Sequence, residues 1–294
     1  NTYRLNDAIS NLFMGTLRTA NKLIIIGAAG YVFYTVETKF ALWRMDASLA
    51  ITWIFAFVIY DFFYYWFHRI SHERQIFWAS HAAHHQSEDY NLSTALRQTG
   101  TGAFVSWVFY TPMFLIGVPS YVFVSVASLN LIYQFWVHSE HIPKLGWYEN
   151  YFVTASNHRV HHAQNEQYID KNYGGVFIIW DRMFGTHKVE DENEACIYGI
   201  RSTLNTFNPI WANLHVYVKI IKEIWFSKDW KDKLYAPFAR TSWTPKSFSL
   251  KSHKDNFDPE TFKKYDPTIS KNQKIYALFQ YVFITYIFLA FIQS

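Results

Sequence analysis

The chain has 294 residues, of which 50% are hydrophobic, 20% are aromatic and only 17% are charged. About a quarter of the residues in a soluble domain are usually charged, whereas the mean hydropathy of -0.08 is too low for a chain buried wholly in lipid, so we predict a membrane part joined to a sizeable polar part. The net charge of +4 is modest and the basic residues form no stripe, which argues against nucleic acid as a partner.

Five apolar stretches are candidate membrane spans. A span takes about 20 apolar residues, and the third and fourth stretches, which a GVPS turn separates, would form a helical hairpin. Tryptophans near the ends of the stretches, such as Trp66 and Trp136, are typical of the aromatic belts at membrane interfaces. The alternative is the buried helical bundle of a soluble protein. The predicted spans are about 23–43, 49–67, 103–118, 121–137 and 275–292.

Ten of the 13 histidines fall into four short clusters: HRISH (68–72), HAAHH (81–85), HSEH (138–141) and HRVHH (158–162). Imidazole is the usual nitrogen ligand for zinc, copper, iron and nickel, and this many histidines indicates two metals. HRISH places two histidines one helical turn apart, and each HxxHH motif places its first histidine at i, i+3 and i, i+4 from the others. The candidate ligands in these motifs are His68, His72, His81, His84 or His85, His158, and His161 or His162.

The order of the spans places all four clusters on one face of the bilayer. The second span ends at Phe67, immediately before the first cluster, and the hairpin returns His138 to the same side. Arginines and lysines around the clusters indicate the cytoplasmic face. We therefore predict an all-α, multi-pass membrane bundle that forms a single domain over 1–294. Its cytosolic, histidine-rich helical cap, at 68–102 and 138–274, would hold a di-metal site. The membrane would be the endoplasmic reticulum in a eukaryote and the inner membrane in a bacterium.

His138 is a further candidate ligand, because it ends an apolar stretch, where an unpaired polar ring would be costly. His141 is more typical of a loop or of a residue behind the ligands. His187, His215 and His253 stand alone and are interpreted as ordinary surface or capping histidines.

Asp61 and Glu73 are the candidate catalytic carboxylates. Asp61 lies seven residues before His68, two turns away on the same helix face, and could accept the free N–H of a ligand histidine. The alternative is a salt bridge or tyrosine contact that holds helices together. Glu73 follows His72 and could be a ligand, an acceptor behind the ligands or an exposed residue; we favour the acceptor. Further polar contacts for a substrate or cosubstrate are offered by Glu88, Asp89, Asn91 and Arg97.

No GxGxxG, P-loop, GxSxG or HExxH motif competes with the histidine site. A membrane metal-binding or transport protein is a remote alternative, because transport would need ligands strung through the spans. A zinc hydrolase needs three protein ligands and an open position, and nine histidines exceed that.

The motifs resemble those of the fatty acid hydroxylase/sterol desaturase superfamily, whose members carry HxxxH, HxxHH and HxxHH around a pair of iron atoms. Within it, HQSEDYNLSTALRQ (85–98) and IDKNYGGVFIIWD (169–181) look most like the alkylglycerol monooxygenase subgroup and its bacterial relatives. The resemblance implies that Glu73 is required for activity. It also implies nine metal ligands: His68, His72, His81, His84, His85, His138, His158, His161 and His162.

The implied activity is that of a non-haem di-iron monooxygenase, which uses O2 to insert oxygen into a lipid C–H bond. In the subgroup the attacked carbon lies next to the ether oxygen of an alkylglycerol, the products are a fatty aldehyde and glycerol, and tetrahydrobiopterin supplies the electrons. The partners would be the bilayer and the lipid, with a protein redox partner if no pterin is used. Zinc could replace iron in purified protein. The alternative is a hydroxylase or desaturase of a fatty acyl chain, sterol or carotenoid.

Overall fold

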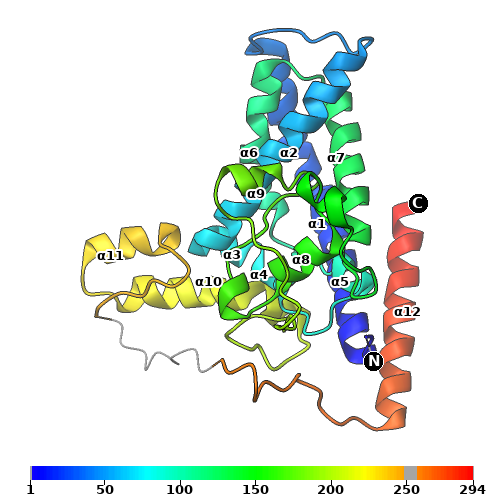
Figure 1. Cartoon of the computed structure of the whole chain (residues 1–294), viewed down its shortest axis with the longest axis vertical. Coiled ribbons are helices and arrows are strands. Elements are labelled where there is room, and N and C mark those ends of the chain that lie inside the picture. The colour runs from blue at the N-terminus through cyan, green and yellow to red at the C-terminus, as the bar shows by residue number, and fades with distance from the viewer. Residues whose placement is uncertain (1, 248–256, 294) are drawn as a thin grey trace.

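The computed structural model describes residues 2–247 and 257–293, and the regular secondary structure within them is helical, with three isolated β-bridges. The all-α prediction is therefore confirmed for the described residues. Long helices form a bundle in the upper half of Figure 1, and shorter ones surround its lower end. The α-helices are α1 Leu5–Lys39, α2 Ala50–Glu73, α3 Gln75–Ala79, α4 Ala82–His85, α5 Leu92–Leu96, α6 Ala103–Ile116, α7 Ser120–Trp136, α8 Ala155–His162, α9 Ile179–Met183, α10 Pro209–Phe226, α11 Trp230–Tyr235 and α12 Lys271–Gln293. The 3-10 helices are η1 Gly146–Asn150, η2 Glu166–Tyr168 and η3 Ala236–Phe238.

The bundle consists of α1, α2, α6 and α7. Helix α6 packs against α1 and α2, and α7 packs against the other side of α2. The turn after α6 requires glycine, because Gly117 has a φ of 105° and an added Cβ would collide with the backbone carbonyl of Trp43. The buried core of the bundle comprises Ala56, Tyr60, Tyr110, Met113, Val118, Val122 and Val126.

Helices α6, α7 and α12 agree with the apolar stretches at 103–118, 121–137 and 275–292. Helices α1 and α2, in contrast, begin or end well beyond the stretches that predict them. Helix α1 begins at Leu5, and its polar first half packs against α5 and buries Asp7, Asn11 and Met14. Helix α2 continues past Phe67 to Glu73. Tertiary packing stabilises these polar turns, which hydropathy does not detect.

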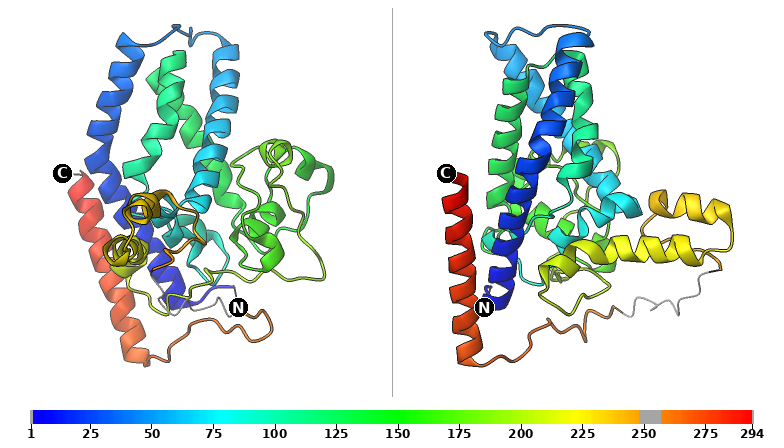
Figure 2. Two further views of the ribbon diagram at one scale, coloured as in Figure 1. Left: turned by 90° about the vertical axis from the view of Figure 1, so that its left-hand side faces the viewer. Right: turned by 180° about the vertical axis from the view of Figure 1, so that it is seen from behind.

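By length and hydropathy, α2 and α12 could each cross a membrane, and α6 is a shorter apolar helix. Two such helices are weak grounds for a membrane assignment by themselves. Helix α12 lies beside the N-terminal half of α1, so it is displaced toward the lower end of the bundle relative to α6 and α7 (Figures 1 and 2). The most apolar part of α12 has no buried residue.

Candidate metal centre

Seven of the nine predicted ligands lie in three helices, and the other two lie at helix ends. His68 and His72 lie in the last two turns of α2, and His138 follows α7. His81 precedes α4, which contains the rest of HAAHH, and α8 contains all of HRVHH. The start of α8 is held by a capping box in which the Thr154 N–H donates to Asn157 Oδ1 over 3.0 Å. Local capping therefore sets the register of the helix that presents three of the histidines.

The structure brings all nine histidines together in two groups. Within each group the ring nitrogens that could bind a metal lie within 4.8 Å of one another. Consecutive histidines divide between the groups, because neighbours on a helix point about 100° apart. The first group is His68, His72, His81, His85 and His161, and the second is His84, His138, His158 and His162.

Backbone carbonyls orient four of the rings. The Nδ1 atom of each faces a carbonyl oxygen, which can only accept a hydrogen bond, so Nδ1 carries the proton and Nε2 has the free lone pair. Nε2 of His68 then lies 3.1 Å from Nε2 of His81, and Nε2 of His138 lies 3.1 Å from Nε2 of His158. The four pairs are His68 with Tyr173 (2.8 Å), His84 with Arg97 (2.7 Å), His138 with Gln134 (2.8 Å) and His161 with Lys171 (2.9 Å).

Several ring nitrogens of the centre have no hydrogen-bond partner among the described residues. They are Nε2 of His72, His161 and His162, and Nδ1 of His158, and all are buried. A buried polar atom without a partner costs about 1–3 kcal/mol, and most buried polar atoms in proteins are paired. One cation in the first group would satisfy Nε2 of His72 and His161, and a second cation in the other group would satisfy Nε2 of His162. The residues present therefore fit two metal ions.

Burial also keeps these rings in the form that binds metal. It lowers the pKa of His84 to about 4, and the pKa values of His138 and His161 to about 3, because the charged imidazolium loses its hydration. The rings are therefore neutral near pH 7. Neutral imidazole is the form that binds metals.

The interpretation of Asp61 as an acceptor for a ligand histidine is wrong. Its buried carboxylate instead accepts from the backbone N–H groups of Val176 (2.8 Å) and Phe177 (2.9 Å), from Nε1 of Trp180 (3.0 Å) and from Nδ2 of Asn130 (2.7 Å). Asp61 faces a loop that approaches α2 closely. The N–H groups of this loop, rather than a histidine, bond to its carboxylate oxygens.

Glycine permits this close approach. A Cβ added to Gly175 would lie 2.7 Å from Asp61 Oδ1 and 2.8 Å from Cδ1 of Tyr64. Asp181, which sequence analysis missed, holds the other side of the loop: its carboxylate accepts from the N–H groups of Tyr173 (2.7 Å) and Gly174 (2.8 Å). The carbonyl of Tyr173 in turn orients His68. In the sequence, the Gly-Gly pair and the aspartate within IDKNYGGVFIIWD were the features that could have indicated this tightly packed loop.

Residues 53–186 match the fatty acid hydroxylase family. The chain carries a fatty acid hydroxylase domain. All nine histidines of the centre lie within the matched residues of this hydroxylase domain.

Most of the chain is similar to alkylglycerol monooxygenases. It is 42% identical to alkylglycerol monooxygenase of Homo sapiens over 244 residues, which cover 82% of this chain and 54% of the relative. It is 38% identical to alkylglycerol monooxygenase of Danio rerio over 281 residues, covering 95% of this chain and 62% of the relative. The chain thus spans a little more than half the length of these relatives.

A more distant relative has a different lipid in its name. Ornithine lipid hydroxylase of Rhizobium tropici is 28% identical over 149 residues, covering 49% of this chain and 44% of the relative. No solved structure matches the chain.

Glu73 of the hydroxylase domain lies outside both histidine groups. Its Oε1 accepts from Nε of Arg69 over 2.8 Å, one helical turn earlier, and the side chain is partly exposed. The structure thus places Glu73 at the edge of the centre, one residue after His72, and its role stays a prediction.

The remaining histidines lie away from the centre where they are described. His141 is exposed, with its ring 3.4 Å from Oγ1 of Thr2, and His215 contacts the carbonyl of Ala212 on its own helix. His187 belongs to neither histidine group, and His253 lies outside the described residues.

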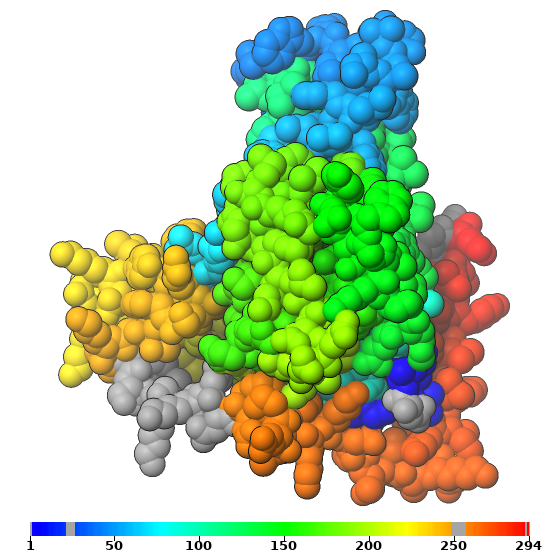
Figure 3. All heavy atoms as spheres, viewed as in Figure 1, coloured from blue at the N-terminus to red at the C-terminus, as the bar shows by residue number. Residues whose placement is uncertain are grey.

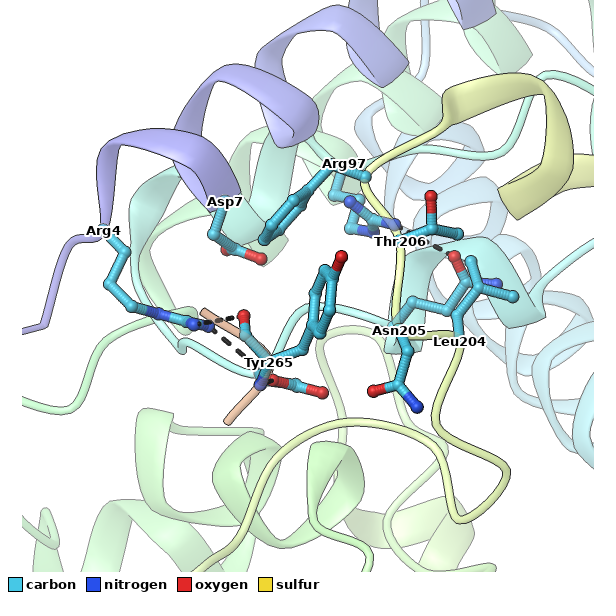
Figure 4. A pocket seen from close by; sticks show the side chains of 10 residues that line it. Arg4, Asp7, Arg97, Leu204, Asn205, Thr206 and Tyr265 are labelled. Atoms are coloured by element: carbon cyan, nitrogen blue, oxygen red, sulfur yellow. Dashed lines mark hydrogen bonds and ion pairs between the residues drawn. The ribbon is translucent and has the colours of Figure 1, made fainter. Parts of the chain in front are cut away.

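Arg97 helps to position the histidine centre, and it also borders a small polar cavity. Its buried guanidinium donates to the Ala83 carbonyl (2.6 Å) and to Gln86 Oε1 (2.9 Å), while its own carbonyl faces His84. Figure 4 shows Arg97 beside a small polar cavity with Asp7 and Arg4. The volume of about 20 Å³ is enough for about one water molecule, so it is too small for a pterin or a lipid.

Proposed function

We propose that this chain is a membrane-bound di-iron monooxygenase that cleaves the ether bond of alkylglycerols to a fatty aldehyde and glycerol. The observation that carries the proposal is the convergence of nine histidines in two groups within a fatty acid hydroxylase domain. One iron would be held by the group that contains His68 and His72, and the other by the group that contains His138 and His158. When bound, the two irons supply the activation of O2. Imidazole also suits zinc, which could occupy the sites in purified protein.

The proposed reaction balances with O2 and a two-electron donor. One oxygen atom enters the C–H bond next to the ether oxygen, and the other is reduced to water with two electrons and two protons. Tetrahydrobiopterin is the proposed donor and is oxidised to the dihydro form. The product is a hemiacetal, whose C–O bond to glycerol then breaks to release glycerol and the aldehyde. The similarity to alkylglycerol monooxygenases over 82–95% of the chain supports this substrate.

Aromatic side chains of the chain shield the proposed centre from water. Two rings lie beside His72 of the first group: its ring centroid is 5.2 Å from that of Trp78 and 5.3 Å from that of Tyr173. Tyr90 covers the second group, with its ring 5.3 Å from that of His162, and its hydroxyl donates to the Val137 carbonyl over 2.9 Å. These rings would help to keep water away from the proposed centre.

We also propose that the bundle of α1, α2, α6 and α7 lies in the bilayer, with the centre at its cytoplasmic end. The apolar helices and a lipid-modifying set of relatives support this position. A metal transporter is less consistent with the structure, because all nine histidines gather at one end of the bundle. The alternative within this class of enzyme is hydroxylation of a different lipid. The match to an ornithine lipid hydroxylase supports this alternative.

The test is an assay of the membrane-reconstituted, iron-loaded protein with 1-O-alkylglycerol. We expect a long-chain aldehyde that forms only with O2 and reduced pterin, and no product from the His84→Ala variant. Aldehyde formation that needs a protein reductase instead of pterin would overturn the assigned donor. A stable hydroxylated product from a fatty acid or sterol, without aldehyde from the ether lipid, would overturn the substrate but leave the oxygenase.

A further inference from the structure

Helix α10 carries a continuous apolar stripe on its outer face. Ala212, Val216, Ile220 and Glu223 are buried against the inner helices. On the opposite face the exposed fractions reach 60% at Ile221 and 76% at Trp225. At about 100° per residue, five of the exposed apolar residues fall within one sector of the helix that no polar residue interrupts. This stripe consists of Ile210, Trp211, Leu214, Ile221 and Trp225.

The next helix also exposes large apolar side chains. On α11, Trp230 and Leu234 are both 73% exposed and lie one helical turn apart. We call the segment 209–240 the arm. Figure 3 shows it projecting from the side of the molecule. A soluble protein rarely leaves so much contiguous apolar surface uncovered, so the arm is expected to have a partner.

The arm is also basic. Segment 209–240 contains six lysines and arginines but three acidic residues, and one of these, Glu223, is buried and bonded to Gln75 over 3.0 Å. Lys222 borders the stripe on α10 and is exposed. On α11, Lys233 lies over the Trp230 ring, 5.0 Å from its centroid. Lysines beside an apolar stripe with tryptophans are typical of helices that lie in a membrane interface.

The axis of helix α10 has the direction that such a position needs. Helix α10 runs crosswise to α1 and α2 in the views of Figures 1 and 2, at the end of the bundle where α3 and α4 lie. If α1 and α2 cross the bilayer, α10 lies parallel to its plane, at the level of the histidine centre. A helix in that plane can bury its apolar stripe among the acyl chains while its lysines reach the headgroups.

We propose that the arm is a membrane-surface anchor, whose apolar stripe enters the cytoplasmic leaflet and whose lysines contact anionic lipid headgroups. This rests on the proposed membrane position of the bundle. Because α10 packs against α4, which carries His84 and His85 of the histidine centre, the anchor would hold the centre at the depth of the lipid headgroups.

The test uses site-specific fluorophores, which the single cysteine makes practical. Cys196→Ser provides a cysteine-free background, and Ile221→Cys, Val124→Cys and Glu192→Cys are labelled separately with an environment-sensitive dye. Ile221 reports the stripe, Val124 reports the exposed surface of α7 in the bundle, and Glu192 is a control in an exposed loop. The full chain is reconstituted in vesicles of phosphatidylcholine with phosphatidylglycerol.

We expect lipids with a nitroxide high on the acyl chain to quench the dye at 221, and aqueous iodide not to reach it. The dye at 192 should behave in the opposite way. Quenching at 124 without quenching at 221 would overturn the anchor while leaving the bundle in the membrane. Absence of lipid quenching at both positions would overturn the membrane position itself. Protection of 221 from both quenchers would show that protein covers the stripe, which also contradicts the proposal.

The charged part is tested with Lys222→Glu combined with Lys228→Glu. Lipid quenching at 221 should fall in vesicles that contain phosphatidylglycerol and should change less in pure phosphatidylcholine, because the reversed charges repel only anionic headgroups. An equal change in both vesicles would refute the role of the lysines.

Discussion

Replacing Asp61 by asparagine distinguishes a positioning role from a catalytic one. Oδ1 of Asp61 accepts from the N–H of Val176 and from Nδ2 of Asn130, while Oδ2 accepts from the N–H of Phe177 and from Nε1 of Trp180. Asparagine keeps one oxygen, so it can retain the first pair and must present an amide NH2 to the second. Two partly buried donors then lose their acceptor.

The magnitude follows from those two donors. An unsatisfied buried donor costs about 1–3 kcal/mol, and these two donors are only partly buried, so each should cost about 1–2 kcal/mol and Asp61→Asn should lower the free energy of unfolding by about 2–4 kcal/mol. At roughly 2 °C per kcal/mol for a chain of this size, the thermal midpoint falls by about 4–8 °C. Trp180→Phe is the matched control: it removes one donor but keeps the ring that packs against Phe62, and we expect a loss of about 1 kcal/mol.

The assay compares the thermal midpoint, the metal content and the turnover per metal-loaded chain in detergent. If Asp61 positions the loop, the asparagine variant unfolds earlier and retains less metal, but its metal-loaded fraction turns over at the wild-type rate. The reasoning is refuted if the variant keeps the wild-type midpoint and metal content and yet loses turnover.

Other substitutions test the centre and its surroundings. His138→Ala should lower the metal content from about two ions per chain to about one, because it opens only the four-histidine group; His215→Ala should leave two, and elemental analysis checks both. Glu73→Gln should abolish turnover with both metals retained, since this carboxylate lies outside the two groups; loss of metal would make it a ligand. Gly175→Ala should lower the thermal midpoint, because its Cβ would lie 2.7 Å from a carboxylate oxygen. In contrast, Gly27→Ala meets nothing within 4 Å and should raise it slightly through helix propensity; equal midpoints would contradict the packing argument.

Local sequence determined the helical class of the chain and the identity of the candidate ligands. Spacings of three and four residues place histidines on one helix face, and long apolar runs with a GVPS turn mark α6 and α7 closely. Both signals act within a few turns of chain, so they can be read without knowledge of the partners. The extension of α1 to Leu5 has no such signal, because packing against α5 stabilises those polar turns.

Tertiary structure decided how the histidines are shared and which groups Asp61 bonds to. His84 and His85 are neighbours in sequence but belong to different groups, since successive residues on α4 point about 100° apart and α2, α7 and α8 approach from different sides. Asp61 could be recognised as buried, but three of its four partners come from a segment 115–119 residues away in the sequence. The spacing of residues along one helix can be inferred from sequence, whereas the segment that packs against it depends on the whole chain.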